Sequence, residues 1–292
     1  MRQNYSNTDW LARSIPLAAI MLLAMLLTAC SFKSVYNRLD FVIAEYVEGL
    51  VTLDDVLESD LENRTELLLD WHRTTQLKQY AEWFREIQAD ANPALNEERL
   101  KYHEHKLETY WLNIRSRLNE DMAEFLPRLS QQQIIELFAS LEEKNEDFRE
   151  DYIDIDNEER RDNYIETITD IYEDWFGELS DEQVIDIEEA ASNLNSGATR
   201  RLQLRMQWQS RIYDVLVADH TQQQKEQLLR EHFDNFDMNS DPELKLINTT
   251  NNSLLRNLTK NIVHSMSAEQ KTYFKERTDD YIRMFEELAE YV

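Results

Sequence analysis

The tetrapeptide Asp70-Trp71-His72-Arg73 contains residue types from which catalytic and ligand-binding sites are often built. On a helix, Asp70 and Arg73 would lie about one turn apart, where they could form an ion pair and hold His72 in a defined position. A ligand-binding or catalytic role for His72 is one interpretation. The other is a packing role, which the aromatic setting favours.

A second group of candidate residues lies in a stretch rich in arginine. Residues 190 to 213 contain no acidic residue, although the whole chain has a net charge of −27. Helical spacing places Arg201, Arg205 and Trp208 on one face, where they could bind a carboxylate, a phosphate or an acidic partner helix. The alternative is that this helix forms internal ion pairs with the acidic helices around it. The candidate binding residues are Arg200, Arg201, Arg205, Trp208 and Arg211.

The motifs of several large catalytic and metal-binding families are absent from the sequence. It has no glycine-rich phosphate loop, no Gly-x-Ser-x-Gly turn and no His-Glu-x-x-His helix. His103 and His105 are two residues apart, so on a helix their rings point in different directions and a shared metal is not expected. Residues 154 to 158 and 237 to 241 resemble the start of a calcium loop but lack its later ligands, which favours a solvated turn or helix start. We expect no catalytic residue, no metal site and no cofactor.

The N-terminal residues have the composition of a secretory signal. Arg2 and Arg13 precede an uncharged run from residue 15 to residue 29, and this run ends at Cys30, the one cysteine of the chain. The run is about 15 residues long, whereas a membrane-spanning helix needs about 20. We therefore expect residues 1 to 29 to be a signal peptide that is removed from the mature protein.

Four residues at the end of this run, Leu27-Thr28-Ala29-Cys30, resemble the lipobox of bacterial lipoproteins. The signal peptidase of that class cuts before the cysteine after a diacylglycerol has been attached to its sulfur. The resemblance implies that Cys30 is the lipidated first residue, held in the membrane by acyl chains such as palmitate. A chance thiol beside an ordinary cleavage site is the alternative. By analogy with Gram-negative sorting, Ser31 in place of Asp implies the periplasmic face of the outer membrane, with the inner membrane as the alternative.

The mature chain is strongly acidic. Residues 1 to 29 carry a net charge of +1, from Arg2 and Arg13 against Asp9, so the total of −27 becomes −28 for residues 30 to 292. Nucleic-acid binding draws most of its affinity from cationic side chains that neutralise phosphates. The charge therefore argues against a nucleic-acid partner and leaves a protein or an anionic envelope component as the expected partner besides the membrane.

Composition and periodicity predict an all-α fold. Three glycines and four prolines in 292 residues are too few for the tight turns of a many-stranded sheet. Apolar residues recur at helical spacing, as in the stripe Tyr80, Trp83, Phe84 and Ile87, which we expect to be core. Breaks at Gly, Pro and Asn clusters predict an elongated bundle of about eight to ten helices. Residues 30 to 292 are expected to form a single domain.

A short phrase recurs three times, as LSQQQ, LSDEQ and MSAEQ, and in each copy a glutamine follows a serine by three residues. This is the capping box, in which the serine hydroxyl and the glutamine side chain satisfy free backbone N–H groups of the first helical turn. We expect the phrase to mark helix starts. The serine and glutamine pairs are Ser130 and Gln133, Ser180 and Gln183, and Ser267 and Gln270; Thr221 with Gln224 and Ser59 with Glu62 fit the same pattern.

The order of the motifs is similar to that in an uncharacterised family of all-helical Gram-negative lipoproteins. The motifs that carry the resemblance are the lipobox, Tyr36-Asn37-x-x-Asp40, Trp71-His72-Arg73, and Trp175-Phe176-Gly177-x-Leu179-Ser180-x-x-Gln183. The resemblance implies no established activity. The LSxxQ phrase also resembles the LTxxQ motif of small periplasmic stress chaperones.

From the sequence we therefore expect an acylated periplasmic lipoprotein that acts as a non-enzymatic binding or structural component of the envelope. A chaperone-like stress protein, which would hold unfolded clients in exposed apolar grooves, is the first alternative. A hydrolase of envelope polymers that uses paired carboxylates is the second.

Overall fold

The computed structural model describes Lys33 and residues 35 to 290, and this part of the chain is built from helices without a strand. The prediction of an all-α fold is confirmed. Eleven α-helices and two short 3-10 helices are present in these residues, slightly more than the eight to ten helices expected. The helices are α4 (Leu39–Glu48), α5 (Asp55–Thr75), α6 (Leu77–Asp90), α7 (Glu97–Phe125), η2 (Leu126–Arg128), α8 (Gln131–Tyr152), α9 (Asn157–Phe176), α10 (Asp181–Ser192), α11 (Ala198–Val217), α12 (Gln222–Asn235), η3 (Met238–Ser240), α13 (Pro242–Ser265) and α14 (Ala268–Glu290).

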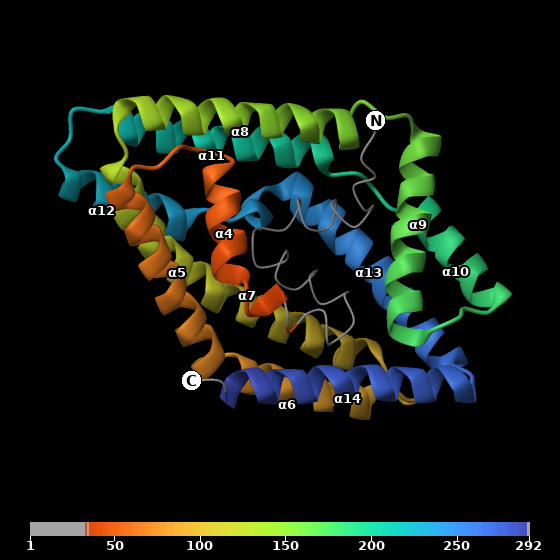
Figure 1. Ribbon diagram of the computed structural model, residues 1–292. Helices are drawn as coiled ribbons and strands as arrows, with labels where there is room; N and C mark the ends of the chain where they lie inside the picture. Colours follow the sequence, from red (N-terminus) through yellow and green to blue (C-terminus); the bar gives the residue numbers. More distant parts are fainter. Residues whose placement is uncertain (1–32, 34, 291–292) are drawn as a thin grey trace, which may run out of the picture.

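The helices are arranged as the sides of a frame (Figure 1). Helices α8 and α11 pack together on one side, α6 and α14 on the opposite side, and α9 with α10 on a third. On the fourth side α12 packs against α7, beside α5, while α13 runs between two sides and packs on α10. The short helix α4 packs against α5. Segments far apart in the chain are therefore neighbours on three of the four sides, whereas α9 and α10 follow each other in sequence.

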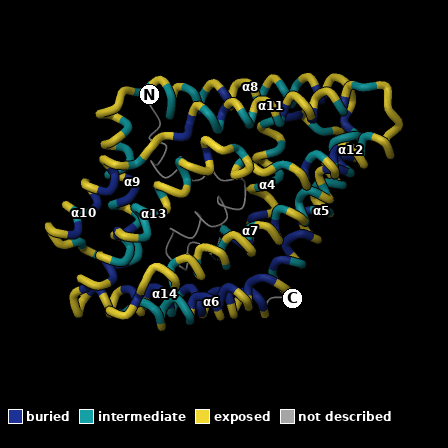
Figure 2. Tube along the Cα trace, turned by 180° about the vertical axis from the view of Figure 1, so that it is seen from behind, coloured by how far each residue is buried: buried dark blue, intermediate teal, exposed yellow. Residues whose placement is uncertain are grey.

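Apolar side chains of the described residues gather in four clusters along these sides. The largest lies between α6 and α14, where Figure 2 shows a concentration of buried positions. It contains Tyr80, Trp83 and Phe84, with Ile87 packed against it, so the predicted core stripe is confirmed. The other clusters join α9, α10, α13 and α14; α5, α7, α8, α11 and α12; and α8 with α11. Burial of apolar area in these clusters is the main stabilising term available to the chain.

Most helix ends follow from local sequence. The three copies of the repeated phrase form capping boxes, and Thr221 with Gln224 forms a fourth. Asp156 and Asp241 accept hydrogen bonds from the first N–H groups of α9 and α13, so the two calcium-like stretches are helix starts. The Ser59 box was a wrong prediction, because α5 begins four residues earlier, after the cap residue Asp54.

Two predictions concern residues at the N-terminus. The signal peptide and the acylation site Cys30 lie outside the described residues. Among the residues that are described, no helix combines the length and the apolar composition that crossing a bilayer requires.

Candidate functional site

His72 lies at the centre of a buried hydrogen-bond chain that joins three segments. His72 is 6% exposed, its Nδ1 lies 2.8 Å from the Tyr36 hydroxyl, and its Nε2 lies 3.3 Å from the Tyr80 hydroxyl. A neutral imidazole has one donor and one acceptor nitrogen, so one tyrosine donates to the ring and the other accepts from it. Tyr36 precedes α4, His72 belongs to the last turn of α5, and Tyr80 belongs to α6. These hydrogen bonds thus hold the segment before α4 on the body of the protein.

The surroundings of His72 keep its ring neutral. Burial and the positive charge of Arg73 lower the pKa of His72 to about 4. Burial raises the pKa of the hydroxyls of Tyr36 and Tyr80 well above their usual range. The Arg73 guanidinium lies over the Tyr36 ring, 5.5 Å from its centroid. Asp70 is exposed, and in the described part of the chain it forms no ion pair with Arg73.

The geometry around His72 therefore differs from the expected one. The tyrosines, rather than an Asp70–Arg73 pair, fix the ring, and Trp71 lies beside it with the ring centroids 6.3 Å apart. Both ring nitrogens are engaged in hydrogen bonds within the protein. A general base needs a nitrogen that can reach substrate, so catalysis at His72 would require one of these bonds to break.

His103 forms a second internal link. Trp83 Nε1 donates to His103 Nδ1 at 3.0 Å, and His103 Nε2 lies 2.9 Å from Asp90 Oδ2. An indole N–H can only donate, so Nδ1 is the acceptor and Nε2 carries the proton of the neutral ring. Burial lowers the pKa of His103, although Asp90 opposes the shift. His105 is exposed and lies near Glu108, so the two histidines point in different directions, as the sequence predicted.

The first two candidate arginines of α11 contact the start of α13. Arg200 Nη2 lies 2.5 Å from Asp241 Oδ2, the residue that caps α13. Arg201 Nη2 donates to Asn248 Oδ1 at 2.8 Å. Arg201 is half-buried, and this burial lowers the pKa of its guanidinium. Both contacts lie within the protein. They correspond to the alternative interpretation, in which the basic helix contacts the helices around it.

The other three candidates contact two further helices or the solvent. The Arg205 guanidinium lies over the Phe148 ring of α8, 4.4 Å from its centroid. Trp208 stacks on His232 of α12 with 6.0 Å between the ring centroids. Arg211 is exposed. The five candidate residues are therefore distributed over several contacts and do not converge on one shared surface.

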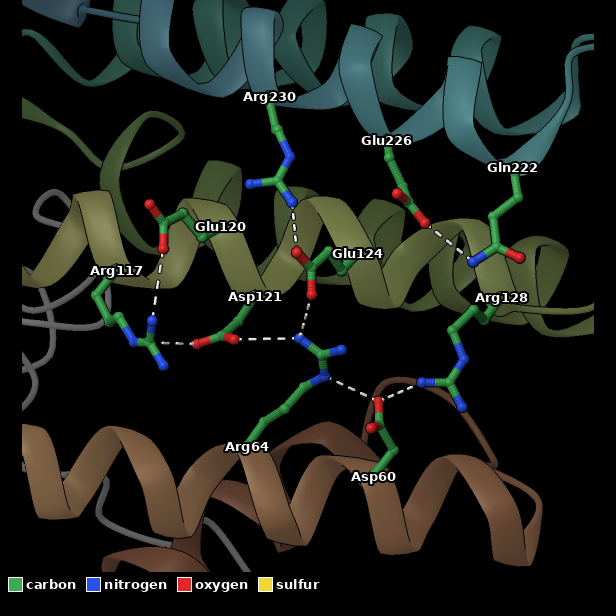
Figure 3. Close-up of polar contacts among 10 residues, drawn as sticks. All are labelled: Asp60, Arg64, Arg117, Glu120, Asp121, Glu124, Arg128, Gln222, Glu226 and Arg230. Atoms are coloured by element: carbon green, nitrogen blue, oxygen red, sulfur yellow. Dashed lines mark hydrogen bonds and ion pairs between the residues drawn. The ribbon is translucent and has the colours of Figure 1, made fainter.

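A network of alternating charges joins α5, α7 and α12 (Figure 3). Arg64 Nε donates to Asp60 Oδ2 at 2.8 Å, and Arg64 Nη1 donates to Asp121 at 3.1 Å and to Glu124 at 3.2 Å. Asp60 also accepts a hydrogen bond from Arg128. Because these groups remain partly open to solvent, the network orients the helices more than it stabilises them. It continues through Arg117, Glu120 and Arg230.

One surface pocket of about 640 Å³ opens beside this network. It is lined by Asp54, Asp55, Val56, Leu57 and Arg128. Its one cation, Arg128, forms an ion pair with Asp60, and the Asp54 side chain caps α5, so these two groups already have partners within the protein. In the described residues no three His, Cys, Asp or Glu side chains are grouped so that they could hold a metal ion.

The second and third copies of the repeated phrase meet in space, which the sequence did not predict. Gln183 Nε2 donates to Gln270 Oε1 at 3.2 Å, and Gln270 Nε2 donates to Gln183 Oε1 at 2.8 Å. Each Oε1 also accepts from the N–H of its own cap residue, Ser180 or Ser267, at 3.0 and 3.1 Å. The two glutamines are 1% and 6% exposed. The paired amides therefore tie the starts of α10 and α14 together inside the protein.

The first copy of the phrase uses its glutamine in the same two ways. Gln133 Oε1 accepts from the Ser130 N–H, while Gln133 Nε2 donates to the Thr52 carbonyl at 3.0 Å. In all three copies the glutamine caps its own helix and links it to another segment. A glutamate could cap the helix equally well but could not donate the second bond.

The helices and contacts described above define an all-helical protein whose polar side chains are largely engaged with one another. Residues 50 to 237 match the model of a family of unknown function, DUF6279. The match covers more than half of the chain and extends from the start of α5 to the end of α12, so the protein belongs to this family. The expected membership of an uncharacterised family is confirmed. No curated protein and no solved structure matches the chain.

Proposed function

We propose that this protein is a lipid-anchored lipoprotein of the bacterial envelope that acts in the periplasm, on the outer membrane, as a non-enzymatic binding or structural component. The observation that carries the proposal is the lipobox-like sequence Leu27-Thr28-Ala29-Cys30 after an uncharged run. Helix α4 begins at Leu39, nine residues after Cys30, so the lipobox-like sequence lies directly before the helical body in the chain.

The hydrogen bonds of the histidine side chains support a non-enzymatic role. His72 and His103 have both ring nitrogens engaged, and two further histidines bond to backbone carbonyls. These groups, which general acid–base chemistry most often uses, here link helices to one another. The two further bonds are His232 Nε2 to the Trp208 carbonyl and His264 Nε2 to the Leu95 carbonyl.

The contacts of α11 favour a structural role over a binding role. Arg200, Arg201 and Arg205 contact α13 and α8, and Arg211 is the exposed member of the group. An envelope partner that binds this helix would therefore meet Arg211 and the exposed part of Arg200 first. A chaperone role would instead rest on exposed apolar side chains elsewhere on the surface.

Metabolic labelling tests the lipid anchor. Cells that express the protein are given an alkyne analogue of palmitate, and the protein is compared with Cys30→Ala. We expect label on the wild type in the outer-membrane fraction, and no label and loss from that fraction for Cys30→Ala, because the variant has no sulfur to carry the diacylglycerol. Equal labelling of both proteins, or a soluble wild type, contradicts the proposal.

Cross-linking in intact cells separates a binding or structural role from a chaperone role. We expect a small set of discrete envelope partners. An Arg211→Glu variant, changed at an exposed position, tests whether any of them binds α11. A broad spread of unfolded envelope proteins, unchanged by this substitution, would move the chaperone role to first place.

A further inference from the structure

Helix α4 presents apolar side chains to solvent. Phe41 is 62% exposed, Val42 is 43% exposed and Tyr46 is 45% exposed. At 100° per residue the three side chains span about 140° of the helix circumference, and the exposed Glu45 lies within that span. Exposed large apolar side chains that share one helix face are typical of a contact surface.

The segment before α4 is bonded to the body of the protein. Lys33 Nζ lies 2.6 Å from Glu287 Oε2 near the end of α14. Tyr36 is 2% exposed and its hydroxyl bonds to His72. Lys33 follows Cys30 by three residues, and a chain of that length spans at most about 10 Å. A lipid anchor on Cys30 would therefore hold this part of the surface close to the membrane.

We infer that the apolar face of α4, formed by Phe41, Val42 and Tyr46, lies on the phospholipid bilayer that holds Cys30. The inference rests on the proposed lipid anchor and identifies the surface that faces the membrane. An amphipathic helix held in the interface binds through its apolar area, and an aromatic side chain with a polar tip such as tyrosine suits the headgroup level.

The charges of α4 indicate which lipid headgroups the helix can contact. Asp40, Glu45 and Glu48 are exposed, and Glu45 lies one turn after Phe41 on the same side. A carboxylate at that place keeps the helix at headgroup depth, because burial of a charge in hydrocarbon is costly. The contact therefore favours neutral headgroups, and anionic lipid should weaken it.

A fluorescent label on α4 tests the contact. The acylated full-length protein is reconstituted in phosphatidylcholine vesicles with a single new cysteine, Val42→Cys, carrying an environment-sensitive dye. Cys30 is the one natural cysteine, so acylation leaves the new thiol as the one that reacts. The matched control is Ile185→Cys on α10, a β-branched residue that is 60% exposed. Nitroxide lipids labelled at the headgroup quench dyes that touch the bilayer surface.

We expect the nitroxide lipids to reduce emission from position 42 by about twofold or more, with little change at position 185. Little quenching at both positions, with Cys30 acylated by mass and the protein floating with vesicles, overturns the inference and leaves the anchor intact. Equal quenching at both positions overturns it as well, because α4 is then not the preferred contact. An unmodified Cys30 and a protein that does not float contradict both proposals.

Discussion

At the scale of single residues, the hydrogen-bond chain through His72 should make stability depend on pH. The pKa of His72 is about 4 in the folded protein against an ordinary value of 6.5. As the pH falls below 6.5 the unfolded chain takes up the proton first, so this stabilisation is present above pH 6.5 and is lost toward pH 4. The loss should be about 3 kcal/mol in the free energy of unfolding.

Urea unfolding at pH 7, 5.5 and 4.5 measures this loss. His72→Phe should lose the part of this pH dependence that comes from His72, while His103 and His232, whose pKa values burial also lowers, keep their parts. The matched control is His105→Gln at an exposed histidine, which should keep the pH dependence of the wild type. If His72→Phe retains that dependence in full, another group is responsible.

Substitutions of the arginines of α11 should differ in their effect on stability. Arg201→Glu places a carboxylate in a half-buried position beside the side-chain oxygen of Asn248, and we expect it to destabilise the protein by about 2 kcal/mol or more. Arg211→Glu, at an exposed position of the same helix, should change stability by less than about 0.5 kcal/mol. Thermal unfolding compares the two variants, and equal melting temperatures would contradict an internal role for Arg201.

At the scale of helices, the end of α9 depends on a glycine. Gly177 has φ 73° and ψ −156°, a conformation that is nearly restricted to glycine, and an added Cβ would lie 3.3 Å from the Tyr273 ring. Gly177→Ala should therefore destabilise the protein by about 1–3 kcal/mol. Gly49→Ala is the control, because Gly49 has helical angles and room for a methyl group. Urea midpoints that shift equally for the two variants would rule out this account.

The paired glutamines predict that a Gln→Glu substitution costs more stability in a buried capping box than in an exposed one. Gln183→Glu keeps the helix cap but loses the donors to Gln270 and Ser265 in a buried site, and we expect a cost of about 2–3 kcal/mol. Gln224→Glu makes the same change in the exposed box with Thr221, where the cap is retained, and should cost less than about 0.5 kcal/mol. Similar urea midpoints would show that the amide pair contributes little.

The helix boundaries were predictable where a local signal marks them. Helices end at Gly177 and just before Pro127, and helices begin at every predicted capping box except that of Ser59. The break between α5 and α6 was missed, because Gln76 keeps nearly helical angles and no glycine or proline stands there. A change of direction that tertiary packing imposes leaves no such signal in the sequence.

At the scale of the whole molecule, composition predicted the fold class but not the arrangement. Too few glycines and prolines for a sheet, together with helical periodicity, were enough to predict an all-α protein. The frame in Figure 1 depends on contacts between distant segments, such as α6 with α14. These contacts are set by side-chain packing across the chain and cannot be read from local spacing.

The long-range partners of the candidate site residues could not be predicted from local spacing either. The sequence singled out His72, but its partners Tyr36 and Tyr80 come from other segments, and Asp70, the neighbour expected to help hold it, is exposed. The sequence also gave no sign that Gln183 and Gln270 would pair, since they lie 87 residues apart. Residue types identified helix caps and core positions, whereas the long-range polar partners required the three-dimensional structure.

The intact mass of the mature protein, purified from bacterial membranes in detergent, shows whether Cys30 carries a lipid. We expect a chain that begins at Cys30, with a mass increased by a thioether-linked diacylglycerol and further acylation of the new N-terminus. A mature chain with a free Cys30 thiol, or one cut at another residue, would contradict the lipid anchor and the role in the envelope that rests on it.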